Sequence, residues 1–543
     1  MTNGLKKLLN GKSTTIISAA VIVAAASFAS RLLGVVRDRI LAGEFGAGNE
    51  LDIYYAAFRL PDLVYSLIVA GALSAGFIPI FSELIFSKKD IKHAWHVANG
   101  VLNILIISLA IICFALAVLA PVLVPVITPG FSGEKLELTV LLSRIMFISP
   151  FFLGISALFG GILQTHKRFI LYSLAPIFYN LGIIFGALFL VHWFGLIGLA
   201  IGVILGAFLH MVIQIPGAVV LGWRYHPILP WKDRYIKKIG KMMVPRIMSL
   251  AVNNINLIFI TAIASTLAAG SIAVFNLANN LQYFPIGIIG FSFAIAAFPT
   301  ISEFAANESW DKFKKAFSNT VRDILFFIIP ASIIFLLLRA QIVRVILGYG
   351  EFTWEDTILT ADALAFFALS LFAQALVPLL VRMFFAIQNT TIPFIAATLS
   401  VVLNVILALW LINPLGVAGL ALAFSLSSIF NVMLLWVILR VRVGYLYEVP
   451  IVQSLYKISV AALAMGFVIQ VSKYVIEPFL NMQTFLGIFT QGLFAGGLGL
   501  IVYCTICLIL RSPEMLNFKA SVQRRLFKKY YKPQEGIDSG SKV

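Results

Sequence analysis

The sequence predicts an all-α polytopic membrane protein with about fourteen transmembrane helices, and three observations carry this prediction. First, 61% of the 543 residues are hydrophobic and only 12% are charged, which is far more apolar than a typical soluble domain. Second, apolar segments of about 20 residues follow one another along the chain with short polar loops between them. Little sequence is left over, so we expect no large soluble domain.

The third observation is an internal repeat. Short anchors recur in the same order at offsets, by subtraction, of 220 to 224 residues: 79–83 with 299–303, 195–200 with 416–421, Gln164 with Gln388, and Asn180 with Asn404. A duplicated unit of this length predicts two six-helix lobes. Because six is even, both lobes enter the membrane from the same side, which makes the repeat parallel and is typical of transporters that alternate access between two lobes.

The repeat also predicts the domain boundaries. The first lobe covers residues 1–221 with helices 1–6, a basic cytoplasmic linker covers 222–240, and the second lobe covers 241–442 with helices 7–12. Two further helices in 443–510 lie outside the repeat, and a basic tail occupies 511–543.

Basic residues gather in alternate loops, and this fixes the predicted orientation. They are Lys88, Lys89, Lys92, Lys167, Arg168, Arg224, Lys232, Arg234, Lys237, Lys238, Lys312, Lys314, Lys315, Arg440 and Arg442. The positive-inside rule places these loops and both termini on the cytoplasmic side of the membrane. The net charge of +17 therefore indicates a membrane protein and no nucleic-acid partner. The tail residues Arg524, Arg525, Lys528 and Lys529 are expected to meet anionic lipid.

The N-terminal segment and the cysteines point to no processing and no redox chemistry. Residues 1–13 carry three lysines but no convincing cleavage site, so we expect a retained first helix. The pair Cys504 and Cys507 has redox spacing but lies in an apolar segment, which favours two buried side chains. No hydrolase, zincin or P-loop pattern is present. The sequence predicts no enzyme and no cofactor.

Charged residues interrupt the first apolar segment, and these are the first candidates for a working surface. Arg31 and Asp38 are seven residues apart and share a helix face. A charge at mid-bilayer costs about 2.5–3.5 kcal/mol, so such residues normally face a bundle interior or a water-filled cavity. An alternative reading is that Arg37, Asp38 and Arg39 mark the membrane edge and snorkel into headgroups.

Further charges lie on the second and fourth segments. Arg59 and Asp62 are three residues apart and able to pair. At 1.5 Å per residue, Arg31 lies roughly 22 Å into the membrane from the inside, and Arg59 and Arg144 lie roughly 12 Å in from the outside. Three arginines are therefore predicted to converge from three helices. For Arg144, a structural contact or snorkelling is the alternative.

The second lobe carries amides where the first carries charge. They are Asn253, Asn254, Asn256, Asn276, Asn279, Asn280 and Gln282. Asn276 and Asn280 share one helix face because they are four residues apart. Such a dense cluster favours a polar cavity, and interhelical contacts worth about 0.6 kcal/mol each are the alternative.

Several motifs together resemble the MurJ (MviN-type) lipid II flippases of the multidrug/oligosaccharidyl-lipid/polysaccharide exporter superfamily. The matching stretches are 30–38 (SRLLGVVRD), 45–48 (FGAG), Asp52, 60–63 (LPDL), 71–74 (GALS), 77–79 (FIP), 128–131 (TPGF), 284–287 (FPIG) and 390–393 (TTIP). The resemblance covers most of the chain. It implies twelve helices in two lobes, two more helices lining a lipid-accessible groove, and outward flipping of an undecaprenyl-pyrophosphate-linked peptidoglycan precursor by alternating access.

The resemblance also implies roles for individual residues. Arg31 and Arg37 match family positions that hold the substrate pyrophosphate, while Ser30, Asp38 and Asp52 match polar positions nearby. Guanidinium groups bind phosphate oxygens bidentately, which agrees with this role. The chain departs from the family at two positions, where Tyr65 and Asn280 replace an expected arginine. Arg59 or Arg144 would then compensate.

The resemblance further implies coupling to membrane potential or to a cation such as sodium in the second lobe. Weak candidate ligands there are Asn254, Asn256, Gln374 and Thr398. Alternatives to lipid II flipping are a flippase for another lipid-linked glycan and a non-transporting scaffold that recruits cell-wall synthesis proteins. Drug export ranks low because a cationic drug needs carboxylates and this chain offers mainly arginines.

Overall fold

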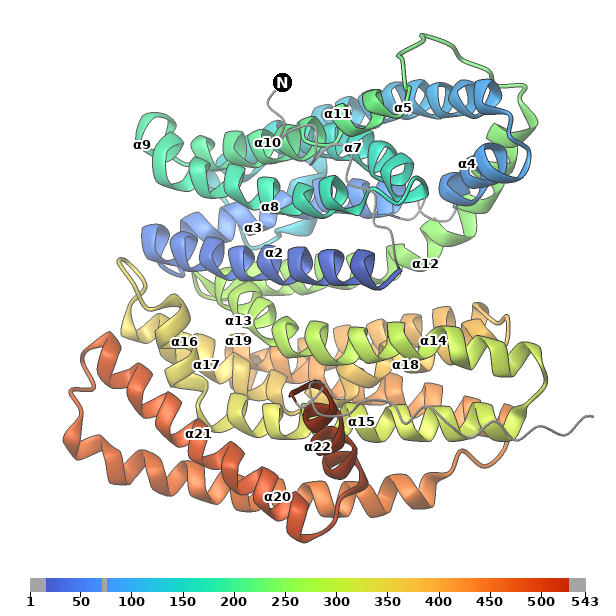
Figure 1. The fold of residues 1–543 in the computed structure, drawn as a ribbon. Helices are drawn as coiled ribbons and strands as arrows, with labels where there is room; N and C mark the ends of the chain where they lie inside the picture. Colours follow the sequence, from blue (N-terminus) through green and yellow to red (C-terminus); the bar gives the residue numbers. More distant parts are fainter. Residues whose placement is uncertain (1–15, 71–75, 527–543) are drawn as a thin grey trace, which may run out of the picture. The chain divides into compact units, whose positions relative to one another are not determined.

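A computed structural model describes residues 16–70 and 76–526 of the protein, and these are helical with no strand among them (Figure 1). Nine of the described helices are long and apolar enough to cross a membrane, or ten if the bent pair α17 (Trp354–Ala368) and α18 (Leu371–Ala386) forms one span. The predicted all-α polytopic class is therefore confirmed. The count of about fourteen spans stays a prediction.

Contacts divide the chain into two compact units. The first contains Met1–Phe284, Arg339–Ser370 and Asn389–Leu435, and the second contains Pro285–Leu338, Leu371–Gln388 and Trp436–Val543. The predicted domain boundaries at residues 221, 240, 442 and 510 stay predictions. Lys528 and Lys529 of the predicted basic tail lie outside the described residues.

The first unit is built mainly from helices of the first half of the chain. They are α2 (Ile16–Phe45), α3 (Asn49–Val64), α4 (Ile78–Ser82), α5 (Ile91–Ile127), α6 (Gly133–Met146), α7 (Ile148–Thr165), α8 (Phe169–Phe185), α9 (Val191–Phe194), α10 (Ile197–Val212), α11 (Ile215–Val220), α12 (Arg234–Ser265), α13 (Ser271–Pro285), α16 (Arg339–Leu347) and α17. Helix α2 packs along α8, α8 packs on α10, and α3 packs on α6. These contacts hold α2 and α3, which carry the predicted charges, against neighbouring helices of the unit.

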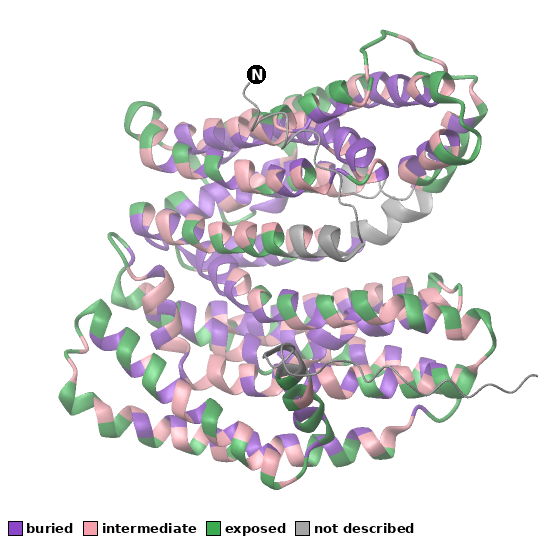
Figure 2. Cartoon of the chain, viewed as in Figure 1, coloured by how far each residue is buried: buried purple, intermediate pink, exposed green. Residues whose placement is uncertain are grey.

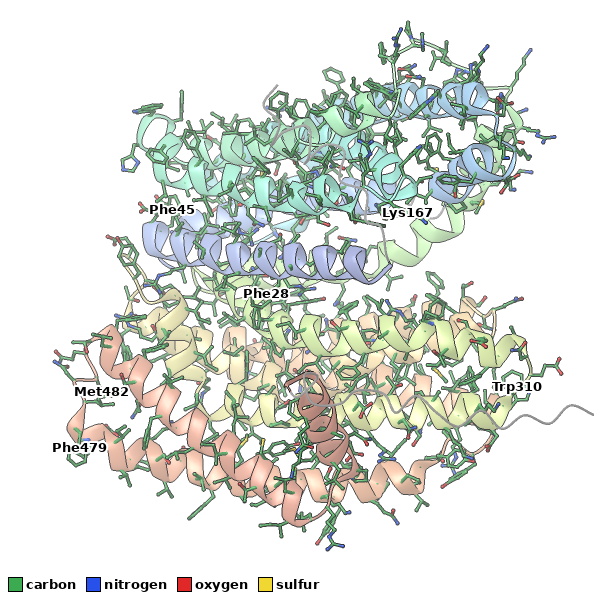
Figure 3. All side chains as sticks on the ribbon, in the orientation of Figure 1. Phe28, Phe45, Lys167, Trp310, Phe479 and Met482 are labelled. Atoms are coloured by element: carbon green, nitrogen blue, oxygen red, sulfur yellow. The ribbon has the colours of Figure 1, made fainter. Side chains whose placement is uncertain are left out.

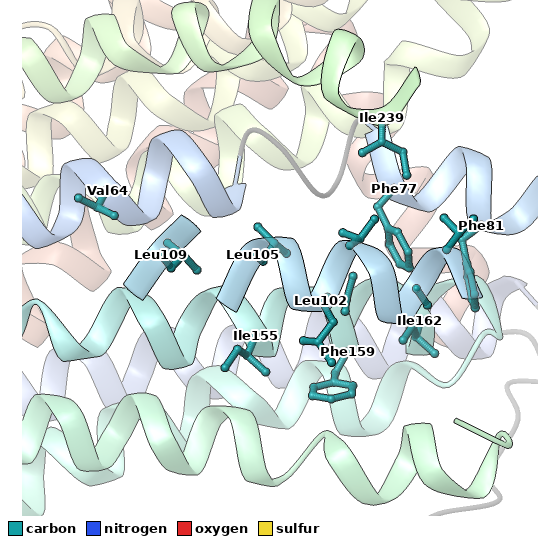
Figure 4. Packing of buried hydrophobic residues seen from close by; sticks show 14 of the residues in the cluster. Val64, Phe77, Phe81, Leu102, Leu105, Leu109, Ile155, Phe159, Ile162 and Ile239 are labelled. Atoms are coloured by element: carbon teal, nitrogen blue, oxygen red, sulfur yellow. The ribbon is translucent and has the colours of Figure 1, made fainter. Parts of the chain in front are cut away.

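One apolar cluster anchors this unit. Phe77, Phe81 and Phe159 are at most 2% exposed and pack with leucines of α5 such as Leu102 and Leu109 (Figure 4). Because lipid tails are as apolar as leucine, tight van der Waals packing holds such helices together in a membrane. The charged helices are thereby held on a rigid frame.

The second unit contains the C-terminal helices. They are α14 (Phe291–Ala306), α15 (Trp310–Leu337), α18, α20 (Glu448–Ile476), α21 (Phe485–Ile509) and α22 (Pro513–Leu526), while the long kinked α19 (Thr391–Val443) ends in it. Helices α20 and α21 lie side by side (Figure 1), and Phe479 and Met482 lie where they are joined (Figure 3). Their exposed faces carry apolar residues such as Phe467 and Leu493 (Figure 2), as expected of surfaces that meet lipid tails.

Short π-helical segments interrupt several helices. They are Tyr65–Ala70, Glu83–Ser87, Gly186–Leu190 and Ile286–Gly290. Such bulges are frequent at functional sites. The first of them begins at Tyr65, directly after α3.

Backbone conformation supports the duplication. Turn residues with a positive φ angle recur in the same order in both halves, at offsets by subtraction of 217 to 224: Gly46 with Gly270, Lys89 with Glu308, Gly133 with Gly350, Lys167 with Gln388, Gly195 with Gly416, and Gly222 with Gly444. L-residues rarely adopt this conformation, and four of these residues are not glycine. Six matched left-handed turns agree with the predicted repeat of a six-helix unit.

A buried ion pair fastens α22 to α15. The Arg322 Nε donates to Glu514 Oε1 at 2.6 Å, and the Glu514 side chain is only 2% exposed. The Ser512 hydroxyl donates to the other carboxylate oxygen at 2.6 Å. The pair therefore holds the start of α22 against α15 within the second unit.

We expect Arg322→Ala to release α22 because the Glu514 carboxylate would stay buried without its cation, which costs about 3 kcal/mol or more. Limited proteolysis of the purified protein should cut α22 much faster in this variant. Lys519→Ala is the matched control, since Lys519 is exposed on the same helix. Equal cleavage rates in the two variants would contradict this role of the pair.

Candidate functional site

A polar cavity of about 290 Å³ lies in the first unit among α2, α3, α8, α12 and α13. Its lining residues are Arg37, Leu41, Tyr54, Tyr55, Phe58, Arg59, Asp62, Tyr179, Leu257, Asn276, Asn279 and Asn280. Most are polar or aromatic, although the surrounding helices are apolar. The structure thus brings Arg37, Arg59, Asp62, Asn276 and Asn280 of the predicted site into one cavity.

Arg37 is held in place on two sides. Its Nε and Nη2 donate to Asp38 Oδ1 at 3.0 and 2.8 Å, and its Nη1 donates to Asn180 Oδ1 at 3.2 Å. The second oxygen of Asp38 accepts from the Asn280 amide at 3.0 Å. The guanidinium is therefore oriented before any ligand arrives, and its charge is partly offset by a buried carboxylate.

Arg59 contacts helices from the second half of the chain. Its Nε donates to the Thr261 hydroxyl and its Nη2 to Asn276 Oδ1, both at 2.7 Å. The expected pairing with Asp62 is not formed; the Asp62 side chain is instead exposed to the cavity. The physical reason is that two neutral acceptors at good distance satisfy the buried guanidinium, which is 9% exposed.

Asp52, a residue of α3, lies outside this cavity, and its carboxylate contacts the start of α13. Its carboxylate accepts from the backbone N–H groups of Gly270 and Ala273 at 2.8 and 3.0 Å, and from Lys135 Nζ at 3.0 Å. The positive end of a helix dipole favours such a carboxylate. Gly270 has φ +87°, and a Cβ there would lie 1.8 Å from the Ala47 carbonyl oxygen, so only glycine fits. Asp52 therefore ties α3 to α13.

A second contact at the same end of the helices involves Arg39. Its Nη1 donates to the carbonyl oxygens of Val345 and Ile346 at the end of α16, at 2.6 and 3.0 Å. The Glu351 N–H donates to the Gly43 carbonyl oxygen at 2.8 Å. Together with Asp52, these bonds join α2 and α3 to α13 and α16 near the loops that carry the acidic residues Glu44, Glu50 and Glu351.

The remaining predicted site residues lie apart from the cavity. Arg31 lies on α2 two turns from Asp38, is exposed, and has no hydrogen-bond or ion-pair partner among the described residues. The Ser30 carbonyl oxygen accepts from the Asn180 amide at 3.5 Å. Arg144 is exposed and donates to the Ala117 carbonyl oxygen at 3.1 Å. The structure does not bring Arg144 to the cavity.

Sequence reasoning missed the aromatic part of the lining. Tyr54, Tyr55, Phe58 and Tyr179 were not singled out, although Tyr55, Arg59 and Asp62 follow the spacing of one helix face. The Tyr55 hydroxyl is buried with no hydrogen-bond partner in the described structure. A buried hydroxyl left unpaired costs about 1–3 kcal/mol, which makes it a candidate ligand contact.

The weak candidate cation ligands are dispersed among other contacts. Asn256 Oδ1 accepts from the Asn404 amide at 2.7 Å, and the Thr398 hydroxyl donates to the Phe394 carbonyl oxygen of its own helix at 2.9 Å. Asn254 and Gln374 also have partners. Within residues 16–70 and 76–526, no cluster of three His, Cys, Asp or Glu side chains forms a metal site.

A duplicated array of membrane-crossing helices around an arginine-containing polar cavity defines a polytopic membrane transporter. The family model described as "Lipid II flippase MurJ" matches residues 41–490. The chain belongs to this family, as its motifs indicated, and the family consists of transporters.

Individual relatives agree with the assignment. A protein of Vibrio cholerae named "Probable lipid II flippase MurJ" is 31% identical over 78% of this chain and 83% of its own length. A protein of Rickettsia prowazekii with the same name is 30% identical over the same shares. The solved structure "Lipid II flippase MurJ, inward closed conformation" is 25% identical, with a TM-score of 0.74 over 93% of this chain and all of that chain. An inward-facing multidrug transporter of the MATE family shares only the fold, at 19% identity and a TM-score of 0.63. The protein is thus a multi-pass inner-membrane protein.

Proposed function

We propose that this protein flips lipid II, the undecaprenyl-pyrophosphate-linked peptidoglycan precursor, from the inner to the outer leaflet by alternating access. The family and the names of the relatives support the substrate. The observation that carries the proposal is the cavity in which Arg37 and Arg59 meet among apolar helices. Arginines at this depth are costly unless they serve a pathway for a polar group.

The pyrophosphate is the part of the substrate that this cavity fits. Two guanidinium groups bind phosphate oxygens strongly in a partly dry site. A volume of about 290 Å³ is at the lower limit of small-ligand pockets, so the glycan and peptide lie beyond it. The unpaired Arg31 captures the headgroup first, and Arg37, Arg59 and the Tyr55 hydroxyl then hold the pyrophosphate.

Asn280 explains how the cavity functions with fewer arginines than the family pattern. An arginine at this position would pair with the Asp38 carboxylate, whereas Asn280 donates one neutral hydrogen bond to it. Asp38 thus remains the counter-ion of Arg37 alone. Tyr65, at the other departure, begins the π-helical segment after α3.

The closed end of the helices defines the direction of the cycle. The bonds of Asp52 and Arg39 join helices of the two predicted lobes at the end that the positive-inside rule assigns to the outside, with both termini in the cytoplasm. Loss of these bonds opens the outer side after the headgroup is bound. Coupling to membrane potential or to a cation drives the return, and cell-wall synthesis proteins are expected partners.

We expect Arg31→Ala to abolish function without loss of the folded protein, because it removes the free cation that first meets the headgroup. Growth of a flippase-depleted bacterium that carries the variant is the measurement, with membrane abundance checked by immunoblot. Full activity of this variant would remove Arg31 from the site.

The scaffold alternative requires a separate variant. A chain ending at Leu526 keeps α22 but removes the end of the basic tail. Normal growth with this truncation, together with loss of growth in Arg31→Ala, would argue against recruitment through that tail. A flippase for a different lipid-linked glycan would fail to support growth in this assay even as the intact chain.

A further inference from the structure

A second cavity, of about 460 Å³, lies where the linker between α11 and α12 passes over the beginning of α5. It shares no lining residue with the first cavity. Figure 1 shows this linker as the green loop that arches over α5. The lining includes Lys92, Trp95 and His96 from α5 and Arg224 and His226 from the linker. The transport cycle above does not use any of these residues.

Buried amides hold the linker in place over α5. Asn99, which is 0% exposed, donates to the carbonyl oxygens of Trp95 and Arg224, both at 3.0 Å, and accepts from the His226 N–H at 3.2 Å. Asn103 donates to the carbonyl oxygens of His226 and Ile228 at 2.8 and 2.9 Å. The basic residues of the linker are therefore fixed by their backbone in front of α5.

This cavity carries positive charge, and no acidic residue lines it. Asp90 and Asp233, which lie close in sequence to the lining residues, have other partners. Asp90 accepts from the His93 N–H at 3.0 Å, and Asp233 contacts the His93 ring at 3.1 Å and accepts from the N–H groups at the start of α12. Lys92 and Arg224 therefore attract an anion to this cavity.

Beyond residues 97–103, which are buried beside the cavity, one face of α5 is exposed and apolar. Its exposed residues are Ile107, Ile111, Phe114, Val118 and Val122. His96 precedes Phe114 by eighteen residues, which is five helical turns, so it projects from the same face. Exposed Tyr225 and Trp231 lie on the linker, as aromatic residues do at the level of membrane headgroups.

We propose that this cavity binds the phosphate of an anionic phospholipid whose acyl chains enter the bilayer beside α5. Basic pockets at the cytoplasmic ends of membrane helices recognise such headgroups. A soluble phosphate would satisfy the charges equally well, and the experiment below separates the two sources. The exposed aromatic residues Tyr225 and Trp231 on the linker favour the lipid.

The test uses the full-length protein in neutral detergent and fluorescent analogues of phosphatidylglycerol and phosphatidylcholine. The variant Lys92→Gln with Arg224→Gln removes both cations of the cavity. The matched control, Lys232→Gln with Lys237→Gln, removes two exposed charges of the same region that do not line it. We expect phosphatidylglycerol to bind the intact protein more tightly than phosphatidylcholine, and the cavity variant to bind it about 10-fold more weakly, since two ion pairs of exposed side chains are lost.

Three results would overturn the proposal. Equal affinity for the two lipids would exclude recognition of the anionic headgroup. Equal weakening in the control would show that diffuse surface charge attracts the lipid. Displacement of phosphatidylglycerol by excess inorganic phosphate, with phosphate binding lost in the cavity variant, would assign the site to a soluble anion. The readout is independent of flipping, so the function proposed above can fail without affecting it.

Discussion

Arg37→Ala is expected to reduce flipping at least 100-fold. The guanidinium lines the cavity and is held in position by Asp38 and Asn180. Its removal eliminates charge-assisted hydrogen bonds to the pyrophosphate, each worth about 1.5–3 kcal/mol, and leaves the Asp38 carboxylate to repel the anion. The measurement is the rate at which lipid II becomes accessible on the far side of proteoliposomes that contain the purified variant.

Arg144→Ala is the matched control for this experiment. It also removes an arginine from the membrane region, but Arg144 is exposed and bonds only the Ala117 carbonyl oxygen in the described structure. We expect its rate to stay close to that of the intact protein. A rate near normal in Arg37→Ala would contradict the assignment of the pyrophosphate to this cavity.

Asp52→Ala is expected to open the outer end of the helices. The carboxylate is 2% exposed and accepts from two N–H groups of α13 and from Lys135. Without it, the N–H groups of Gly270 and Ala273 stay buried and unpaired, which costs about 1–3 kcal/mol each in the closed state. A change of this size shifts the ratio of closed to open molecules by about 100-fold or more.

Accessibility of the cavity measures this shift. A cysteine at Leu257, which lines the cavity, should react faster with a membrane-impermeant maleimide added outside the cell when Asp52 is replaced. Glu50→Ala is the control, because Glu50 is an exposed carboxylate two residues away. Identical labelling rates in the two variants would show that Asp52 does not hold the outer end closed.

The sequence was sufficient for the fold class and for the charged residues Arg37, Arg59 and Asp62 of the cavity lining. Long apolar segments have few structural alternatives in a membrane, since every backbone group must be satisfied within a helix. Arg37 and Arg59 were recognisable because charge inside such segments is costly. The repeat was visible as matched anchors, and the matched positive-φ turns follow from it.

The partners of these charges were not predictable. Arg59 contacts Thr261 and Asn276, which are 202 and 217 residues away, and nothing local in the sequence identifies them. Arg144 shows a related limit. The helical rise per residue gives the depth of Arg144 in the membrane. Only the packing of its helix determines that the side chain lies away from the cavity. Tyr55 and Tyr179 were missed because an aromatic residue in an apolar segment is usually part of the packing.

The most direct test of the central claim replaces the resident lipid II flippase of a bacterium with this chain and measures the precursor exposed on the outer face of the membrane. We predict that exposure is restored by the intact chain and lost with Arg37→Ala. Absence of exposed precursor, with the intact protein present in the membrane at normal abundance, would contradict lipid II flipping.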